Sequence, residues 1–121
     1  MSEIELYNVA FSTCSQRVRF VLGEKGVPYV DTRLRLELGE HVTPKYLAIN
    51  PNGLVPALKH DGAVITDSSV INEYLDEVFP GTRLIPRDPV DRARVRMLSQ
   101  IIACDIQPMQ NIHICGIGHA V

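Results

Sequence analysis

The stretch at residues 55–66 reads VPALKHDGAVIT and predicts a β-hairpin. Two short runs suited to strands, residues 55–59 and 63–66, flank the dipeptide Asp61-Gly62. Asp-Gly between two such runs is a strong hairpin signal, because both residues tolerate the positive φ angles of a tight turn. Pro56 has no N–H group, so it must lie at the start or the edge of its strand. The middle of the chain therefore predicts an antiparallel pair of strands.

Alternating strand and helix patterns surround this hairpin. Apolar periodicities of two and of 3.6 residues distinguish the strands from the helices. The further elements predicted before residue 80 are strands at 4–9 and 29–36 and helices at 15–25, 43–48 and 67–79. Thr43-Pro44 strengthens the short middle helix, because it places an N-cap residue before a Pro at the first helical position. The resulting order, βαβαββα, predicts an α/β domain that is complete by about residue 79.

A different pattern follows residue 80. Residues 80–87 are rich in Pro and Gly and predict a linker. Asp88-Pro89 then predicts the start of an amphipathic helix whose apolar stripe needs partner helices. We therefore expect a first domain at residues 1–79, a linker at residues 80–87, and at residues 88–121 the first helix of a truncated α-helical domain. The apolar, Gly-broken tail also suggests that the chain is a fragment of a larger protein.

Composition narrows the class of protein. The chain has 121 residues, with 12 Lys or Arg and 14 Asp or Glu, and thus a formal net charge of −2. This balance argues against a nucleic-acid-binding protein that depends on phosphate contacts. No apolar run approaches the roughly 18 residues that a membrane-spanning helix needs. We expect a globular protein without nucleic-acid or membrane partners.

The cysteines indicate a reducing compartment. Cys14, Cys104 and Cys115 are odd in number and widely spaced, so they do not resemble a disulfide framework. No C-x-x-C motif occurs, and no His flanks a Cys at zinc-site spacing, so we expect no metal site. The acidic N-terminus lacks the apolar segment of a signal peptide. A cytoplasmic location is therefore expected, and there a cysteine near a helix start can be chemical.

The segment Ser12-Thr13-Cys14-Ser15 lies where the first strand passes into the first helix. A helix N-terminus offers free N–H groups and a partial positive charge, which stabilise a thiolate of Cys14 or of a bound ligand. A serine hydroxyl at the same place can donate to that thiolate. Helix capping is the favoured explanation for Ser12 alone. Ser12 together with Cys14, Arg17 and Arg19 favours a functional site.

A second candidate site is the helix start at residues 66–69, Thr-Asp-Ser-Ser. Helix capping again explains these residues. N–H groups at a helix N-terminus can also hold a carboxylate or phosphate, and Asp67 can hold an ammonium group. A ligand with both charges, such as an amino-acid end, would use both features.

Other positions are less informative taken singly. An ordinary edge proline is the favoured reading of Pro56, although a cis Pro56 would expose the Val55 backbone to a peptide-like ligand. His41 and His60 are predicted to be surface residues. A contact with the first domain is slightly favoured over a ligand contact for Asp105, which lies beside an apolar stripe.

Four segments together resemble a cytosolic glutathione transferase, and most closely its zeta class, which includes maleylacetoacetate isomerase. The segments are Ser12-Thr13-Cys14-Ser15-Gln16-Arg17-Val18-Arg19, Asn50-Pro51-Asn52-Gly53-Leu54-Val55-Pro56, Asp67-Ser68-Ser69 and Ile106-Gln107-Pro108-Met109-Gln110-Asn111. The resemblance implies a thioredoxin-like βαβαββα N-terminal domain that binds glutathione, followed by the start of an all-α glutathione transferase C-terminal domain. It covers essentially the whole chain.

The resemblance also implies roles for individual residues. Ser12 would hydrogen-bond the glutathione thiolate, and Cys14 would assist addition or resolve a mixed disulfide. The cysteinyl backbone of glutathione would pair with Val55, beside a cis Pro56. The remaining implied glutathione contacts are His41 to the glycyl end, Asp67 and Ser68 to the γ-glutamyl end, and Gln107 and Asn111 on the second domain.

The implied function is attack of the glutathione thiolate on a small electrophile. The outcome would be conjugation, cis–trans isomerisation of a maleyl-type substrate, or dehalogenation, because reductive dehalogenases of the same class resemble the Ser12-x-Cys14 arrangement. The full-length protein would be a homodimer. Two alternatives stay open: a glutathione- or protein-binding module without turnover, and a redox protein that uses Cys14 as a single thiol.

Overall fold

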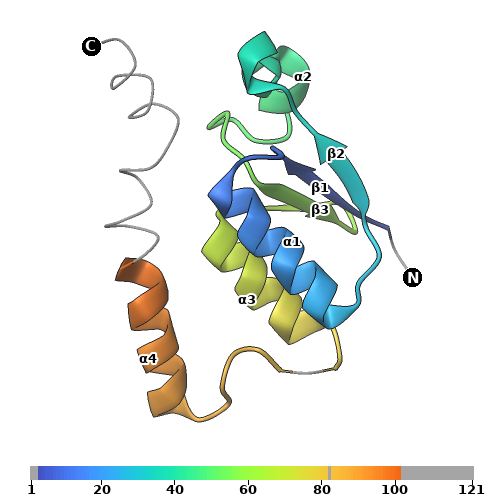
Figure 1. The fold of residues 1–121 in the computed structure, drawn as a ribbon. Coiled ribbons are helices and arrows are strands. Elements are labelled where there is room, and N and C mark those ends of the chain that lie inside the picture. Colours follow the sequence, from blue (N-terminus) through green and yellow to red (C-terminus); the bar gives the residue numbers. More distant parts are fainter. Residues whose placement is uncertain (1–2, 82, 102–121) are drawn as a thin grey trace. The chain divides into compact units, whose positions relative to one another are not determined.

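A four-stranded mixed sheet forms the centre of the first part of the chain (Figure 1). The computed structural model describes residues 3–81 and 83–101. The strands are β1 (Ile4–Asn8), β2 (Val30–Arg33), β3 (Ala57–His60) and β4 (Ala63–Thr66), in the order β2-β1-β3-β4. β1 and β2 are parallel, whereas β3 is antiparallel to both β1 and β4. The predicted order of elements and the thioredoxin-like fold are confirmed.

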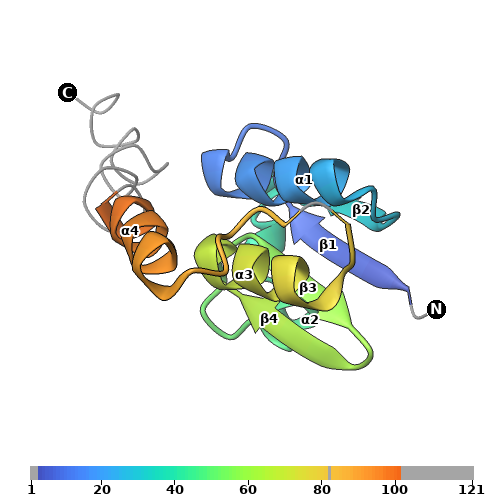
Figure 2. The same cartoon turned by 90° about the horizontal axis from the view of Figure 1, so that it is seen from below.

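Two helices, α1 (Thr13–Lys25) and α3 (Ser68–Val78), lie next to each other on one face of this sheet (Figures 1 and 2). Side chains alternate between the two faces of a strand, so Ile4 and Leu6 of β1 point toward the helices. The core of the domain consists of Ile4, Leu6, Val18, Leu22, Leu58, Ile71 and Leu75. Both helices are therefore held to the sheet by apolar burial.

The start and the end of α1 follow the predicted signals. Ser12 is the N-cap, and its Oγ accepts a hydrogen bond from the Ser15 N–H at 3.2 Å. Gly26 ends the helix in the left-handed conformation, with φ of 64°, and its N–H donates to the carbonyls of Gly23 and Leu22. Glycine adopts this conformation without the steric cost that a Cβ atom would bring.

The predicted strand at 29–36 was too long, because β2 contains only residues 30–33. Its last residue, Arg33, pairs with Asn8, the last residue of β1. Beyond that point β2 has no strand to pair with, apart from one bond from the Leu34 N–H to the Asn8 carbonyl at 2.8 Å. The chain turns instead into two 3₁₀ helices, η1 (Leu36–Leu38) and η2 (Glu40–Val42).

The middle of the domain matches the turn chemistry of the sequence. The short helix α2 (Pro44–Leu47) begins after Thr43, whose side chain accepts from the Tyr46 N–H at 3.3 Å. Asp61 and Gly62 have φ angles of 52° and 80°, as a two-residue hairpin turn requires. The predicted hairpin is thus confirmed, with β3 starting at residue 57 rather than 55.

One prediction about the face between β3 and α3 was wrong. The stripe of α3 that faces α1 and the sheet carries Ile71 and Leu75, whereas Val70 and Val78 are 53% and 44% exposed. His60, predicted at the surface, is only 8% exposed, and its Nδ1 lies 2.6 Å from the Tyr74 hydroxyl oxygen. Strand alternation explains His60, because it shares the α3-facing side of β3 with Leu58.

The chain divides into two compact units, residues 1–83 and 84–121. In the second unit, α4 (Pro89–Gln100) begins at Asp88, whose carboxylate accepts from the Asp91 N–H at 3.1 Å. None of the residues of α4 is buried, and its apolar side chains Met97 and Leu98 are 65% and 64% exposed. Residues 102–121 lie outside the described residues, so the predicted domain boundaries stay a prediction. Within residues 3–81 and 83–101, no helix has the length and apolar character for crossing a bilayer.

Candidate functional site

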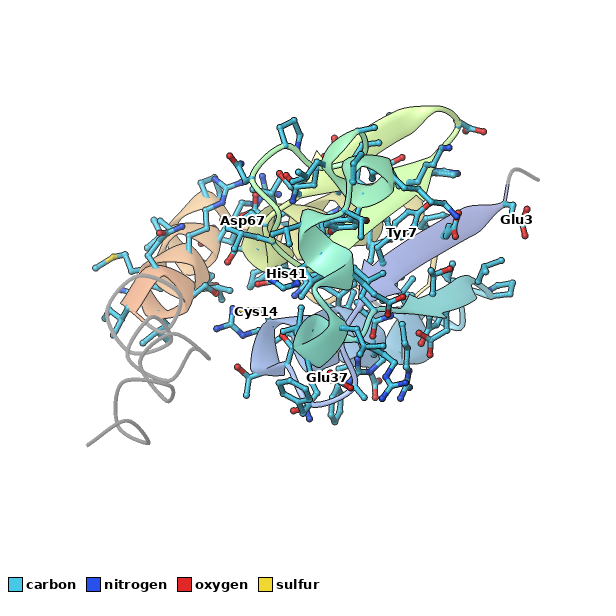
Figure 3. The ribbon with its side chains drawn as sticks, turned by 90° about the horizontal axis from the view of Figure 1, so that it is seen from above. Glu3, Tyr7, Cys14, Glu37, His41 and Asp67 are labelled. Atoms are coloured by element: carbon cyan, nitrogen blue, oxygen red, sulfur yellow. The ribbon has the colours of Figure 1, made fainter. Side chains whose placement is uncertain are left out.

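The sheet register brings three loops to one edge of the sheet. Tyr7 near the end of β1 pairs with Ala57 at the start of β3, and Ala57 pairs with Thr66 at the end of β4. The loops that follow β1, precede β3 and follow β4 therefore meet the sheet at neighbouring positions. Figure 3 shows Cys14, His41 and Asp67 toward this end of the domain, away from Glu3. The predicted site residues of the first domain come from these loops and from η2.

The first loop places Ser12 and Cys14 at the N-terminus of α1. The Ser12 oxygen accepts the capping bond, and among the described residues its hydroxyl proton has no acceptor. Cys14 is a free, partly buried thiol in the first turn of the helix. No acidic side chain lies in that turn, so nothing there opposes the positive end of the helix dipole. This helix start can stabilise a thiolate.

The second loop presents the backbone of Val55. The Val55–Pro56 peptide bond is cis, as the resemblance implied, and Pro56 is buried. Val55 precedes β3, and within residues 3–81 and 83–101 no backbone hydrogen bond of Val55 is found. Its N–H and carbonyl are therefore available to pair with an extended peptide, as an added strand would.

The third loop places Asp67 and Ser68 at the N-terminus of α3. Asp67 is the N-cap, and its Oδ1 accepts from the Ser69 N–H at 2.9 Å. Its φ angle of 75° is unusual for a residue other than glycine, and such backbone conformations cluster at functional sites. Buried Ser68 accepts a hydrogen bond from Arg17 Nη1 at 3.3 Å, which connects α3 to α1.

His41 lies in η2, beneath the turn that leads to Val55. A Cβ atom on Gly53 would lie 3.3 Å from the His41 carbonyl oxygen, and Gly53 has a φ of 64°. Glycine is therefore required at position 53 for this close approach. The turn that precedes Val55 therefore passes close to the His41 backbone.

Unpaired polar atoms gather around the same edge. Among the described residues, four buried side-chain polar atoms lack a hydrogen-bond partner: Arg17 Nη2, His41 Nδ1, Ser69 Oγ and Asn72 Oδ1. They belong to α1, η2 and the first two turns of α3, which are the elements that border the three loops. Buried polar groups are nearly always paired, so such a cluster points to a polar ligand or to ordered water.

Tyr7 lies near these loops but cannot serve as a thiol activator. Its hydroxyl donates to Glu5 Oε1 at 2.9 Å, and its ring contacts Tyr46 on the face of the sheet opposite to the helices. Burial and, to a lesser extent, the Glu5 carboxylate raise the pKa of Tyr7. The phenol is therefore a neutral group that is already bound to a carboxylate.

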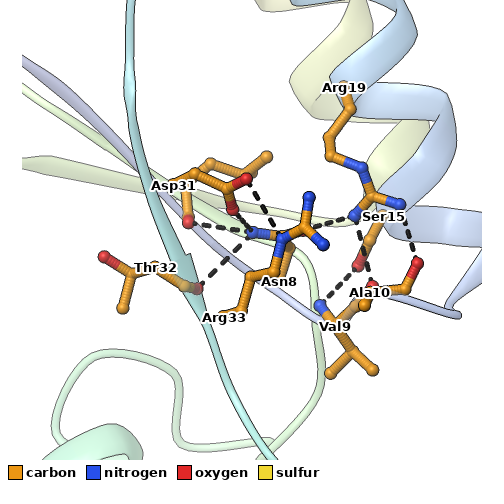
Figure 4. Close-up of polar contacts among 9 residues, drawn as sticks. Asn8, Val9, Ala10, Ser15, Arg19, Asp31, Thr32 and Arg33 are labelled. Carbon is orange, nitrogen blue, oxygen red and sulfur yellow. Dashed lines mark hydrogen bonds and ion pairs between the residues drawn. The ribbon is translucent and has the colours of Figure 1, made fainter.

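A hydrogen-bonded network behind the Ser12 loop was missed by the sequence reasoning, which considered only its member Arg19 (Figure 4). Fully buried Asn8 receives a bond from Arg19 and donates to Asp31 Oδ1 at 2.7 Å. The signal was present in the strand pattern, since Asn8 has the same parity as Ile4 and Leu6 and must point into the core. A polar residue at such a core-facing position needs hydrogen-bond partners.

Part of the predicted site cannot be placed. Gln107 and Asn111, as well as Asp105, lie outside the described residues. In the part of the chain that the structure describes, no group of three His, Cys, Asp or Glu residues is arranged to hold a metal ion. The residues that the structure does place form three features. They are the start of α1, which can stabilise a thiolate, the unpaired backbone groups of Val55, and the start of α3 with the Asp67 carboxylate.

The chain is similar in sequence to known proteins. The family model described as "Glutathione S-transferase, N-terminal domain" matches residues 11–78. Maleylacetoacetate isomerase of Mus musculus is 46% identical over 111 residues, which cover 90% of this chain and 51% of that protein. The chain spans about half the length of the curated relatives it matches.

Two solved structures are similar as well. A bacterial maleylpyruvate isomerase, described as a zeta-class glutathione S-transferase, superposes with a TM-score of 0.86 at 41% identity, covering 93% of this chain and 53% of that one. Maleylacetoacetate isomerase from Methylobacterium extorquens AM1, solved with bound malonate and GSH, gives a TM-score of 0.86 at 40% identity, with coverage of 91% and 52%.

Proposed function

Because the chain belongs to the glutathione S-transferase family, we propose that it binds glutathione at this edge of the sheet and promotes attack of the thiol on a small electrophile. The observation that carries the proposal is the cluster of four unpaired buried polar atoms around the three loops. Glutathione is a charged peptide with polar groups along its length, and it fits a site that offers donors and acceptors over several elements.

Each loop meets a different part of the peptide in this proposal. Asp67 has one carboxylate oxygen beyond the capping one, and this oxygen faces the γ-glutamyl ammonium group. Ser68 and the N–H groups at the start of α3 hold the neighbouring carboxylate. Val55 pairs with the cysteinyl backbone through its unused N–H and carbonyl. His41 donates from its ring to the glycyl carboxylate.

Ser12 is the proposed thiol activator. Its oxygen accepts the capping bond from Ser15, so its proton remains for donation to the sulfur. Donation to the charged form of an acid lowers its pKa, and the N-terminus of α1 adds to this effect. Bound glutathione supplies the nucleophile, a thiolate. Cys14, in the first turn of the same helix, assists addition or resolves a mixed disulfide.

The favoured reaction class is isomerisation of a maleyl-type substrate, with conjugation or dehalogenation as outcomes when another group leaves. Support comes from the relatives, which include maleylacetoacetate isomerases from mouse and Pseudomonas aeruginosa and a maleylpyruvate isomerase from Ralstonia. Gln107 and Asn111 are proposed to contribute from the second domain. We also propose a cytoplasmic homodimer for the complete protein, which sedimentation of that protein would test.

A second function is favoured by one observation: the Cys14 thiol is partly exposed at a helix N-terminus. That position suits a redox protein, because helix N-termini stabilise the thiolate form of cysteine. In such a protein the Cys14 thiolate would attack a disulfide between glutathione and a substrate thiol, forming the Cys14–glutathione mixed disulfide and releasing the substrate as its thiol. Thiol-transfer activity lost in Cys14→Ala, together with no activity toward electrophiles in the unchanged protein, would support this alternative.

Isothermal titration tests the main proposal. Glutathione is titrated into the chain at pH 7 in two buffers of different ionisation enthalpy, and an analogue with a methyl group in place of the thiol serves as the control. We expect both ligands to bind at millimolar concentration or below, and only glutathione to release protons. A folded sample that binds neither ligand would refute the proposal. Binding without proton release would leave a binding module without thiol activation.

A further inference from the structure

We propose that Arg19 is a positioning residue for the thiol site: its guanidinium group fixes the loop at residues 9–12, and this loop carries Ser12. The inference rests on the proposed function, because it assumes that Ser12 meets a glutathione thiol. It assigns to Arg19 no contact with glutathione. The residue acts through the backbone of the loop.

The contacts of Arg19 converge on three successive residues (Figure 4). Nη1 donates to the Val9 carbonyl at 3.2 Å, and Nη2 donates to the Ala10 carbonyl at 2.9 Å. Nη1 also donates to the side-chain oxygen of Asn8. A guanidinium group is planar, with donors in a fixed fork, so three acceptors held at once define its position and theirs.

One carbonyl connects this fork to Ser12. The Val9 carbonyl that accepts from Arg19 also accepts from the Ser12 N–H, at 3.2 Å. The Val9 N–H in turn donates to Oγ of fully buried Ser15 at 3.2 Å. Both peptide groups of Val9 are therefore held, and a shift of its carbonyl moves the backbone of Ser12.

Asn8 anchors the same fork to the sheet. It is fully buried at the end of β1, and its Nδ2 donates to Asp31 Oδ1 at 2.7 Å and to the Leu6 carbonyl at 3.3 Å. Asp31 lies on β2, the parallel neighbour of β1. The bonds through Asn8 thus fix the guanidinium group relative to β1 and β2. Its bonds to the Val9 and Ala10 carbonyls fix the loop relative to the same two strands.

Lysine provides the discriminating substitution. It keeps the positive charge, but its single ammonium group cannot reproduce the rigid fork. Arg19→Lys therefore removes the positioning and keeps the charge, whereas Arg19→Gln removes both. Arg35→Lys is a matched control, because Arg35 makes its side-chain bond to exposed Glu37 and is itself 64% exposed.

The experiment measures the pKa of the bound glutathione thiol from the ultraviolet absorbance of the thiolate, with the chain saturated with glutathione. In both Arg19 variants we expect the acid dissociation constant of the thiol to fall by about three- to tenfold. Affinity for the analogue without a thiol should stay within about twofold of the wild-type value, because its contacts do not involve this loop. Arg35→Lys should leave both values unchanged.

Asp31→Ala provides a second route if the Arg19 variants do not fold. Asp31 is exposed, so we expect Asp31→Ala to fold, and this substitution removes the main acceptor of Asn8. We expect a thiol pKa shift in the same direction, but smaller. An unchanged thiol pKa in folded Arg19→Lys, or in Asp31→Ala when neither Arg19 variant folds, overturns the proposal. A wild-type chain that does not lower the thiol pKa identifies a failure of the proposed function instead.

Discussion

The Lys25 ammonium nitrogen lies 2.9 Å from Asp76 Oδ1, and the two side chains are only 1% and 2% exposed. This ion pair joins the last turn of α1 to α3. Lys25 Nζ also donates to the Asp76 and Phe79 carbonyls at 3.4 and 3.2 Å, so it satisfies carbonyl groups at the end of α3. The pair therefore fixes the ends of the helices that lie farthest from the candidate site.

Loss of one partner of this pair should be costly. Asp76→Ala leaves a buried ammonium group without its counter-charge, which typically lowers the free energy of unfolding by about 3–5 kcal/mol. Urea unfolding monitored by circular dichroism measures the change. Glu37→Ala is the matched control, because Glu37 meets Arg35 at a similar 3.0 Å but on the surface. Equal effects of the two substitutions would show that burial does not determine the value of the pair.

Substitutions can separate the N-cap role of Ser12 from its proposed role as thiol donor. Ser12→Ala removes both the N-cap and the proposed thiol donor, so we expect a loss of about 1 kcal/mol in stability and a higher pKa of the bound thiol. Ser12→Asp keeps a capping oxygen but has no proton to donate at pH 7. It should therefore retain the stability and still lose the activation. Thermal unfolding and the thiolate absorbance are the measurements, and normal activation in Ser12→Asp would exclude donation from Ser12.

Cys14→Ala tests the chemical role of the cysteine. We expect isomerisation of a maleyl-type substrate to be lost, while the Kd for glutathione stays within about threefold of the wild-type value because the thiolate-stabilising helix start is retained. Steady-state assays and titration measure the two quantities. Cys104→Ala is the control for removing a thiol elsewhere. Wild-type turnover in Cys14→Ala would limit this residue to a packing role.

The raised pKa of Tyr46 predicts that the free energy of unfolding depends on pH. Its hydroxyl donates to the Leu54 carbonyl at 2.6 Å, and burial raises its pKa to about 12 from the model-compound value of 10.0. The folded state thus favours the protonated phenol, so this contribution is complete below about pH 10 and is lost as the pH rises through about 12. Tyr46→Phe should cost about 0.5–1.5 kcal/mol near neutral pH.

Urea unfolding of both proteins from pH 8 to 12 tests the Tyr46 prediction. The difference in stability between wild type and Tyr46→Phe should be constant at first and should shrink above about pH 10. Tyr29→Phe is a suitable control, because among the described residues the Tyr29 hydroxyl has no hydrogen bond. A difference that does not change with pH would mean that Tyr46 titrates alike in the folded and unfolded chain.

Local signals in the sequence were sufficient for most of the fold. Thr43-Pro44 and Asp61-Gly62 specify their own conformations, and the structure has the helix and the turn that they predict. The end of β2 was not predictable in this way, because it depends on where its neighbour β1 ends. The Lys25–Asp76 pair was missed for the same reason. Its members are 51 residues apart, and the local sequence around one does not indicate the other.

The candidate site shows the same division between local and distant information. Capping by Ser12 and Asp67 follows from residue type and position, and it is confirmed. The arrangement of both beside Val55 required the strand register, which only the folded sheet provides. His60 was misplaced because residue type alone favours the surface for a histidine, whereas its shared side with Leu58 on β3 turns it inward. The functional roles of these residues stay proposals for the experiments above.

The β3–β4 hairpin has a practical consequence for engineering. Its open end sets the spacing between Val55 and Asp67, whereas its turn, Asp61-Gly62, lies at the opposite end of both strands. Residues inserted at the turn would leave the pairing of Ala57 with Thr66 unchanged. Exposed loop tips of this kind accept insertions best. The turn is thus a suitable attachment point for a fluorophore or an affinity tag, at a distance from the candidate site.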